Sequence, residues 1–191
     1  YNESLPFQLS QGDVYSCSLS QYSLNGGLEF LKSELFVEVS DQIDKAQNVG
    51  FVVFDERQLL TSTYKEIIQA KTLLANAKNA EDYLDIWTKL REAFGTLHFI
   101  STTLENKRLI GMTSAVYLSA VMAAFSATLA FFLFEKEKRK ILSNIVIFIV
   151  FLVLLYFFHP GAHVIIDENA ILFLESAAIS FAGVSSLVFG L

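Results

Sequence analysis

Three long apolar runs occupy the C-terminal part of this chain. They cover residues 109–134, 141–158 and 170–191, and a charged cluster at 135–140 separates the first two. A bilayer core about 30 Å thick needs about 20 residues of helix, because each residue adds about 1.5 Å. The runs lack the regular alternation of barrel strands. The pattern therefore predicts three membrane-spanning helices.

Alternating apolar and polar positions characterise the N-terminal part. Residues 15–19 alternate in this way, and Leu35, Val37 and Val39 alternate with the polar positions 34, 38 and 40, whereas 50–54 is apolar on both faces. Period-two alternation is typical of strands with one buried face. The glycines at 12 and at 25–27 indicate turns between the strands. We therefore expect residues 1–55 to form a small antiparallel β-sandwich.

The periodicity becomes helical after residue 55. Apolar residues recur every three or four positions over 56–78 and again over 80–108, where the expected buried face includes Trp87, Leu90 and Phe94. Asn79 is a favourable N-cap for the second of these helices. We expect a two-helix stalk or hairpin at 56–108, with its second helix continuing into the first span. The predicted fold is thus an α+β membrane protein with a β-sandwich (1–55), a helical stalk (56–108) and a three-span domain (109–191).

The basic residues of the first loop predict the membrane topology. Lys136, Lys138, Arg139 and Lys140 lie there, whereas the loop at 159–169 has no Lys or Arg. By the positive-inside rule, the basic loop and the C-terminus are cytoplasmic and the head is outside a cell membrane. The same cluster could bind anionic lipid headgroups. The chain starts at Tyr1 without a methionine, so either a signal peptide has been removed or upstream sequence is missing, and this topology favours the first.

Composition excludes several classes of function. Residues 1–108 carry ten Lys and Arg against fifteen Asp and Glu, so an acidic head would repel nucleic acid. Cys17 is the only cysteine, which rules out an intrachain disulfide. The sequence has no glycine-rich phosphate loop and no nucleophile elbow. We therefore expect a protein that is not an enzyme and carries no cofactor.

One segment resembles a known family. Residues 5–9 read LPFQL, residues 11–15 read QGDVY, and residues 50–55 read GFVVFD. These segments make residues 5–60 similar to the GOLD-type β-sandwich heads of the p24 family, whose members follow the sandwich with a helical stalk and a membrane span. Members of that family have a paired disulfide and a single span, whereas this chain has one cysteine and three predicted spans. A cargo-receptor function is therefore not implied.

Small residues recur at every fourth position in the first and third apolar runs. Residues at this spacing share one helix face, and small side chains let helices approach closely in lipid. The two ridges are Gly111, Ala115, Ser119, Ala123 and Ala127, and Ala178, Ala182, Ser186 and Gly190. We expect these ridges to pack the first span against the third, or to pack against copies or other subunits.

Glu175 is the only residue inside a predicted span that is charged at neutral pH. An intramembrane carboxylate can act as a proton relay or a cation ligand. It lies about one turn from the end of its span, so the alternative is a structural residue that reaches interfacial water.

The loop between the second and third spans gathers imidazoles and carboxylates. It contains His159, His163, Asp167 and Glu168. These groups suit Zn²⁺ or Cu²⁺, so a metal site is one hypothesis. An ordinary polar loop is the alternative, because the Pro-Gly pair after His159 predicts a turn that does not bring the ligands together.

These features together predict a non-catalytic accessory or structural subunit of a larger membrane complex. Its partners would be other membrane subunits or itself, together with the bilayer. The first alternative is a homo-oligomeric ion channel or transporter-like protein that uses Glu175. The second is a ligand-binding or sensing protein whose head signals through the continuous helix into the first span.

Overall fold

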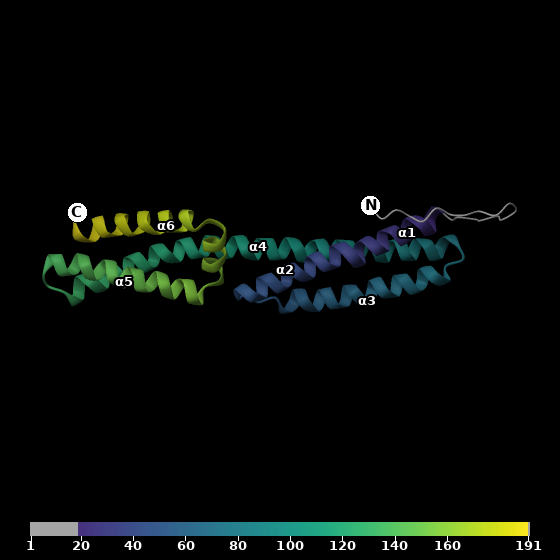
Figure 1. The fold of residues 1–191 in the computed structure, drawn as a ribbon, viewed down its shortest axis with the longest axis horizontal. Helices are drawn as coiled ribbons and strands as arrows, with labels where there is room; N and C mark the ends of the chain where they lie inside the picture. Colours follow the sequence, from purple (N-terminus) through teal and green to yellow (C-terminus); the bar gives the residue numbers. More distant parts are fainter. Residues whose placement is uncertain (1–18, 191) are drawn as a thin grey trace.

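The protein is an elongated rod of helices (Figure 1). The computed structural model describes residues 19–190. The elements are α1 (Leu19–Phe30), a π-helical turn η1 (Leu31–Leu35), α2 (Phe36–Val49), α3 (Phe54–Asn76), α4 (Ala80–Leu133), α5 (Glu137–Phe158) and α6 (Pro160–Phe189). The first three form one continuous helical rod along the head. Helix α4 is 54 residues long and runs through both halves of the molecule.

The predicted β-sandwich is wrong for the residues that the structure describes. Residues 19–49 are helical, and 50–53 form only the connection to α3. Strands proposed at residues 1–18 lie outside the described part of the chain. The glycines at 26 and 27, interpreted as a turn, lie inside α1, and the turn lies instead at Gly50, whose φ of +102° ends α2 in the left-handed region. The sandwich implied by the resemblance to the p24 family is therefore not formed by residues 19–55.

The π-helical turn explains why the helical pattern of this region is hard to recognise. Leu31, Val39 and Ile43 are all buried on one side, with Leu35 partly buried between them. Twelve residues separate Leu31 from Ile43, which in a regular α-helix would rotate the two side chains by about 120° from each other. A π turn holds about one extra residue. The extra residue therefore brings Val39 and Ile43 back to the same side of the rod as Leu31.

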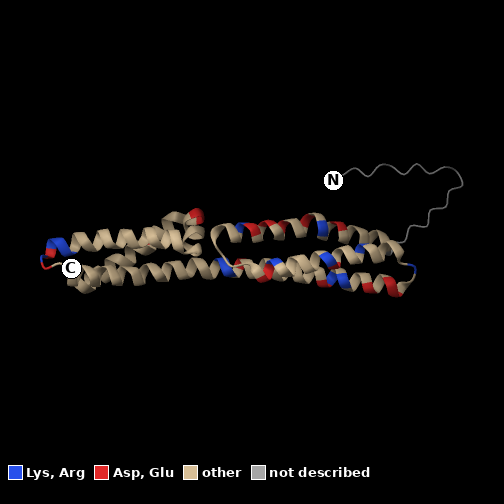
Figure 2. Ribbon diagram, turned by 90° about the horizontal axis from the view of Figure 1, so that it is seen from below, with Lys and Arg blue, Asp and Glu red and all other residues tan. Residues whose placement is uncertain are grey.

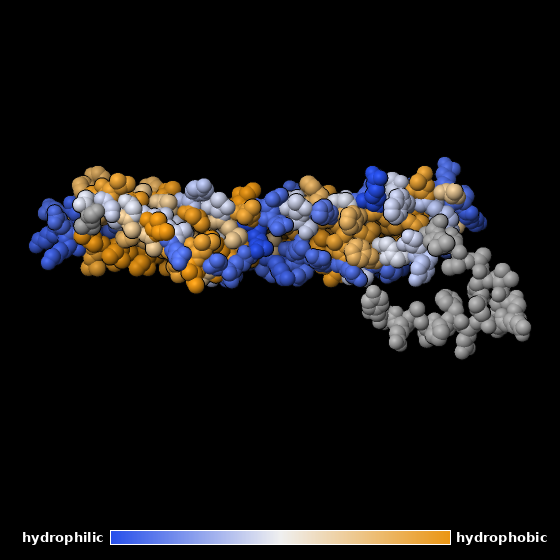
Figure 3. Space-filling view, turned by 90° about the horizontal axis from the view of Figure 1, so that it is seen from above, coloured by the Kyte–Doolittle hydropathy of each residue, from blue (hydrophilic) through white to orange (hydrophobic). Residues whose placement is uncertain are grey.

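The other half of the rod consists of the three apolar helices. The C-terminal part of α4 packs against both α5 and α6. All three are long and apolar enough to cross a membrane, so the prediction of a multi-pass membrane protein is confirmed at this level. Charged residues gather on the head and at the α4–α5 connection (Figure 2). The surface of the membrane half is mainly hydrophobic, with a hydrophilic band where it meets the head (Figure 3).

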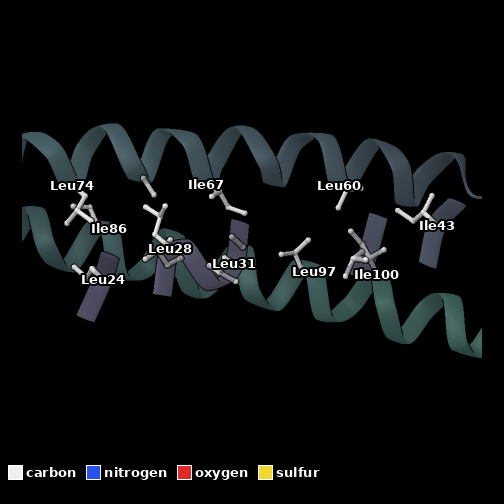
Figure 4. Packing of buried hydrophobic residues seen from close by; sticks show 14 of the residues in the cluster. Leu24, Leu28, Leu31, Ile43, Leu60, Ile67, Leu74, Ile86, Leu97 and Ile100 are labelled. Carbon is white, nitrogen blue, oxygen red and sulfur yellow. The ribbon is translucent and has the colours of Figure 1, made fainter. Parts of the chain in front are cut away.

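The core of the head is a three-helix bundle (Figure 4). Buried positions alternate in steps of four and three along α3 and α4, which is the spacing of a coiled-coil seam. They are Glu56, Leu60, Thr63, Ile67, Ala70 and Leu74 on α3, and Ile86, Leu90, Ala93, Leu97, Ile100 and Leu104 on α4. Leu24 and Leu28 of α1 pack into the same cluster. Helices α3 and α4 therefore form an antiparallel hairpin that the first helical rod covers.

Asn79 caps the start of α4, as predicted, and the structure shows that the cap is reciprocal. Its side-chain oxygen accepts a hydrogen bond from the backbone N–H of Asp82 at 2.9 Å, and the Asp82 carboxylate accepts one from the N–H of Asn79 at 3.3 Å. This arrangement satisfies amides that the first turn leaves free. The buried face predicted for α4 is correct at Leu90 and wrong at Trp87 and Phe94, which are exposed.

Helix α6 is bent at Asn169. This residue has non-helical angles (φ −154°, ψ 71°), and its side-chain oxygen caps the following segment by accepting a hydrogen bond from the N–H of Leu172 at 3.1 Å. Residues 160–168 therefore form a separate short helix before the membrane segment. The turn predicted after His159 is wrong, because Pro160 occupies the first helical turn, where its missing N–H costs nothing.

Candidate functional site

The head and the membrane half meet where α4 crosses the short first segment of α6. Gly111 and Gly161 lie at this crossing, and both are buried. A Cβ atom on Gly111 would lie 3.3 Å from the Cα of Gly161, and one on Gly161 would overlap the backbone of Gly111. Two glycines therefore allow the helix backbones to touch. Gly111 was predicted as the first member of a packing ridge.

A buried carboxylate holds the start of α3 to α4 beside this crossing. Glu56 is only 5% exposed, and its Oε1 lies 2.7 Å from the Nζ of Lys107. Lys107 also donates to the backbone oxygen of Val52 at 2.8 Å. The second carboxylate oxygen, Oε2, is buried without a hydrogen-bond partner among the described residues. One lysine thus ties the α2–α3 connection and α3 to the membrane end of the head.

A second ion pair joins α4 to α6. The guanidinium of Arg108 contacts the Glu168 carboxylate, sixty positions along the chain. These residues line a groove of about 460 Å³ between the head and the short segment of α6. The rest of the lining mixes charged residues (Lys45, Glu105, Asp167) with apolar ones (Val49, Phe51, Leu104, Val164).

His159 is fixed at the same junction by a chain of hydrogen bonds. The Ser114 hydroxyl donates to the backbone oxygen of Gly111 at 2.8 Å, so it accepts from Nε2 of His159 at 3.2 Å. This network assigns the proton to Nε2 and leaves Nδ1 as an unpartnered buried lone pair. Because His159 is partly buried, desolvation of the charged form lowers its pKa.

Three of the four residues of the proposed metal site contact different partners, and the fourth, Asp167, lines the groove. His159 contacts Ser114, and the ring of His163 lies 4.3 Å from the ring of Tyr156, centroid to centroid. Glu168 pairs with Arg108. Within residues 19–190, no three His, Cys, Asp or Glu side chains converge in a way that could hold a metal ion.

The two small-residue ridges have different environments. All five members on α4 are buried, and Ala115 and Ala123 lie in clusters with residues of α5 and α6. The members on α6, by contrast, are exposed at Ala178, Ala182, Ser186 and Gly190. Helix α6 instead contacts the bundle through the neighbouring face that carries Phe173 and Ala177. One ridge therefore builds the bundle, and the other lies on its outer surface.

A polar cluster inside the membrane bundle is absent from the predicted sites. The side-chain oxygen of Asn144 accepts a hydrogen bond from Ser126 at 2.8 Å, and its amide donates to Ser185 at 2.9 Å. Asn144 and Ser126 are fully buried. The three residues come from α5, α4 and α6, so this cluster links all three helices. An amide in an otherwise apolar run is the sequence signal that could have identified it.

Glu175 has no hydrogen bond or ion pair with any residue in the described part of the chain, and its side chain is exposed on α6. Ser176, its neighbour in the chain, and Thr113 of α4 donate instead to backbone oxygens of their own helices, those of Phe173 and Leu109 respectively.

The basic cluster lies at the far end of the membrane half. Lys136 precedes α5, and Lys138, Arg139 and Lys140 belong to its first turn. The ammonium of Lys140 lies 4.2 Å from the centroid of the Phe131 ring. The other three basic side chains are exposed, which suits contact with water or lipid headgroups.

Comparison with known protein families, characterised proteins and solved structures finds no match to this chain.

Proposed function

We propose that this protein is a non-catalytic structural subunit of a larger membrane complex. In this role, its three membrane helices pack beside other subunits, and its helical head extends along the partner outside the membrane.

The exposed ridge on α6 carries this proposal. Ala178, Ala182 and Ser186 expose only small side chains along one line of α6, although the same kind of ridge on α4 is buried inside the bundle. Lipid chains form few favourable van der Waals contacts with such a surface, whereas another helix can approach it closely and form many. A subunit that must dock laterally in the membrane needs a surface of this kind.

The topology proposed with this role places the head outside and the α4–α5 connection in the cytoplasm. The four basic residues at 136–140 support it. Thr88→Cys on the exposed surface of the head and Lys138→Cys in the first turn of α5, each in a Cys17→Ser background, test it. A membrane-impermeant maleimide added to intact cells should label the first variant and not the second. The reverse result overturns the topology.

Native mass spectrometry of the protein, extracted in mild detergent from its own membrane without overexpression, tests the function. We expect an assembly whose mass includes different, larger chains in a fixed ratio. A mass that is an integral multiple of the 21.4 kDa chain overturns the proposal.

A homo-oligomeric channel is the second candidate, and the position of Glu175 favours it. Glu175 lies three residues before Ala178 and therefore on the same exposed face as the ridge. Copies that meet through this face would form a ring of carboxylates near one end of the membrane helices. In bilayer recordings, Glu175→Gln should then change the ion selectivity. Unchanged selectivity, or the absence of current, excludes this function.

A further inference from the structure

The head half of α4 carries a second apolar stripe that the bundle does not use. Leu84, Trp87 and Phe94 are 65%, 56% and 48% exposed. With the exposed side chains of Arg91 and His98 they follow one another in steps of three, four, three and four. This is the spacing of a coiled-coil seam, rotated away from the seam of Leu90 and Leu97 that packs the head core.

The stripe faces water rather than lipid. Trp87 lies 22 residues before the first span and therefore about 33 Å along a continuous helix from it. Figure 3 shows hydrophobic surface on the head, beyond the hydrophilic band at the junction. Large apolar side chains at helical spacing on a water-exposed surface are typical of a binding surface for another helix.

The middle of the stripe has an unpaired positive charge. Arg91 forms no ion pair with any residue in the described part of the chain and lies one turn from Trp87. The ring of Phe94 stacks on that of His98 with an interplanar angle of 3°. Trp and Arg are the residue types that contribute most often to binding hot spots. A complementary partner therefore needs an apolar helix face with a carboxylate opposite Arg91.

A second copy of this chain does not meet that requirement. Copies in one membrane insert in the same direction, so their α4 helices run parallel, and a two-fold contact through the stripe places each residue opposite its own counterpart. Arg91 would then face Arg91.

We propose that this stripe docks an amphipathic helix from a different subunit, which places an acidic side chain against Arg91. This inference rests on the proposed function, because it requires a heteromeric complex, and it names the surface by which the head engages that complex.

Site-specific photo-crosslinking in the native membrane tests the proposal. A benzophenone amino acid replaces Trp87 or Phe94 in the full-length chain, expressed at its natural level. The control position is Glu92, which is exposed and lies about 140° around the helix from Trp87. We expect both stripe positions, and not position 92, to link to one and the same different protein, and we expect the linked peptide to be helical and acidic.

Charge reversal supplies the second readout. R91E should reduce the crosslinking yield at position 94 at least about fivefold, because it places like charges together. K89E makes the same change in net charge on the opposite side of the helix and should leave the yield unchanged. An equal fall in both variants overturns the role of Arg91.

The remaining outcomes test the docking inference independently of the proposed function. A crosslink to a second copy, a crosslink within the chain to residues 1–18, or no crosslink at either stripe position overturns the docking inference. If native mass spectrometry still finds different chains, the subunit function stands without this surface. If it finds only copies of this chain, the function itself fails.

Discussion

At the scale of single residues, two glycines in helices should respond oppositely to the same substitution. A Cβ at Gly95 would meet nothing within 4 Å, so Gly95→Ala should stabilise the head by about 0.5–1 kcal/mol by reducing the entropy of the unfolded chain. At Gly161 the added atom would overlap the backbone of Gly111, and Gly161→Ala should destabilise the protein by about 1–3 kcal/mol. Denaturant unfolding measures both. If Gly161→Ala does not destabilise the protein, the crossing is not tight.

His159 should make stability depend on pH. Burial lowers its pKa in the folded state, so the unfolded chain binds the proton more readily. The stabilisation is therefore complete above the unfolded-state pKa of about 6.5 and is lost as the pH falls through the lowered folded-state pKa. The melting temperature should drop between pH 7.5 and 5.

His159→Gln should reduce that drop, since the glutamine amide can still donate to Ser114 without taking a proton. His98→Gln is the matched control, because His98 is exposed on the head and far from this junction. The expectation fails if both variants retain the same pH dependence as the natural protein.

At the scale of elements, the π-helical turn at Leu31–Leu35 gives a sharp test of how the head is aligned. Deleting the exposed Ser33 should convert the π turn to regular helix and keep Val39 and Ile43 on the buried side, so stability should change by less than about 1 kcal/mol. Deleting the exposed Glu66 from the regular helix α3 rotates all later residues by about 100° and should unfold the head. Circular dichroism and denaturant unfolding compare the two. Equal damage would show that the π turn is needed for another reason.

The same turn explains which elements could be predicted from sequence. Regular spacing made the helices at 56–108 and the three apolar helices recognisable. In the rod formed by α1, η1 and α2, the extra residue of the π turn changes the angular position of Val39 relative to Leu31. Short stretches of this sequence therefore resemble the alternation of apolar and polar residues in a strand. Contacts between distant positions, such as Arg108 with Glu168, have no local signal. The outward face of α6 depends on how the helices pack, which the fourfold spacing of Ala178 and Ala182 does not specify.

The hydrogen bonds of Asn144 should contribute to the packing of all three membrane helices. Asn144→Ala removes both its bonds, to Ser126 and Ser185, and should cost about 1–2 kcal/mol in a lipid environment. Leu142→Ala, on the exposed side of α5, is the control and should cost less. Reversible unfolding in bicelles by a denaturing detergent measures the difference. Equal costs would mean that the amide adds nothing beyond its volume.

At the scale of the whole molecule, α4 is the element that makes head and membrane half one body. It supplies one side of the head core and all five buried positions of the packing ridge. Because the helix is continuous, the orientation of the head depends on the contacts around residues 107–111. Glu56, Lys107, Arg108 and the two glycines act at this one level of the rod.

The pair of Glu56 and Lys107 should decide whether α3 stays attached at that level. Lys107→Met leaves a buried carboxylate without its cation. The expected cost is about 2 kcal/mol, below that of a fully buried pair because 36% of the lysine side chain is exposed. Replacing both residues with Met removes the unpaired charge and should bring stability back to within about 1 kcal/mol of the natural protein.

Hydrogen exchange of the first two turns of α3 measures this effect locally in the full-length protein. Lys107→Met should speed exchange there about thirty-fold, since 1.4 kcal/mol corresponds to a factor of ten, whereas the double variant should exchange nearly as slowly as the natural protein. Exchange in the membrane helices should not change, because their core contacts are separate from this pair. If the double variant exchanges as fast as the single one, the lysine acts by packing and by its bond to Val52 rather than by neutralising Glu56.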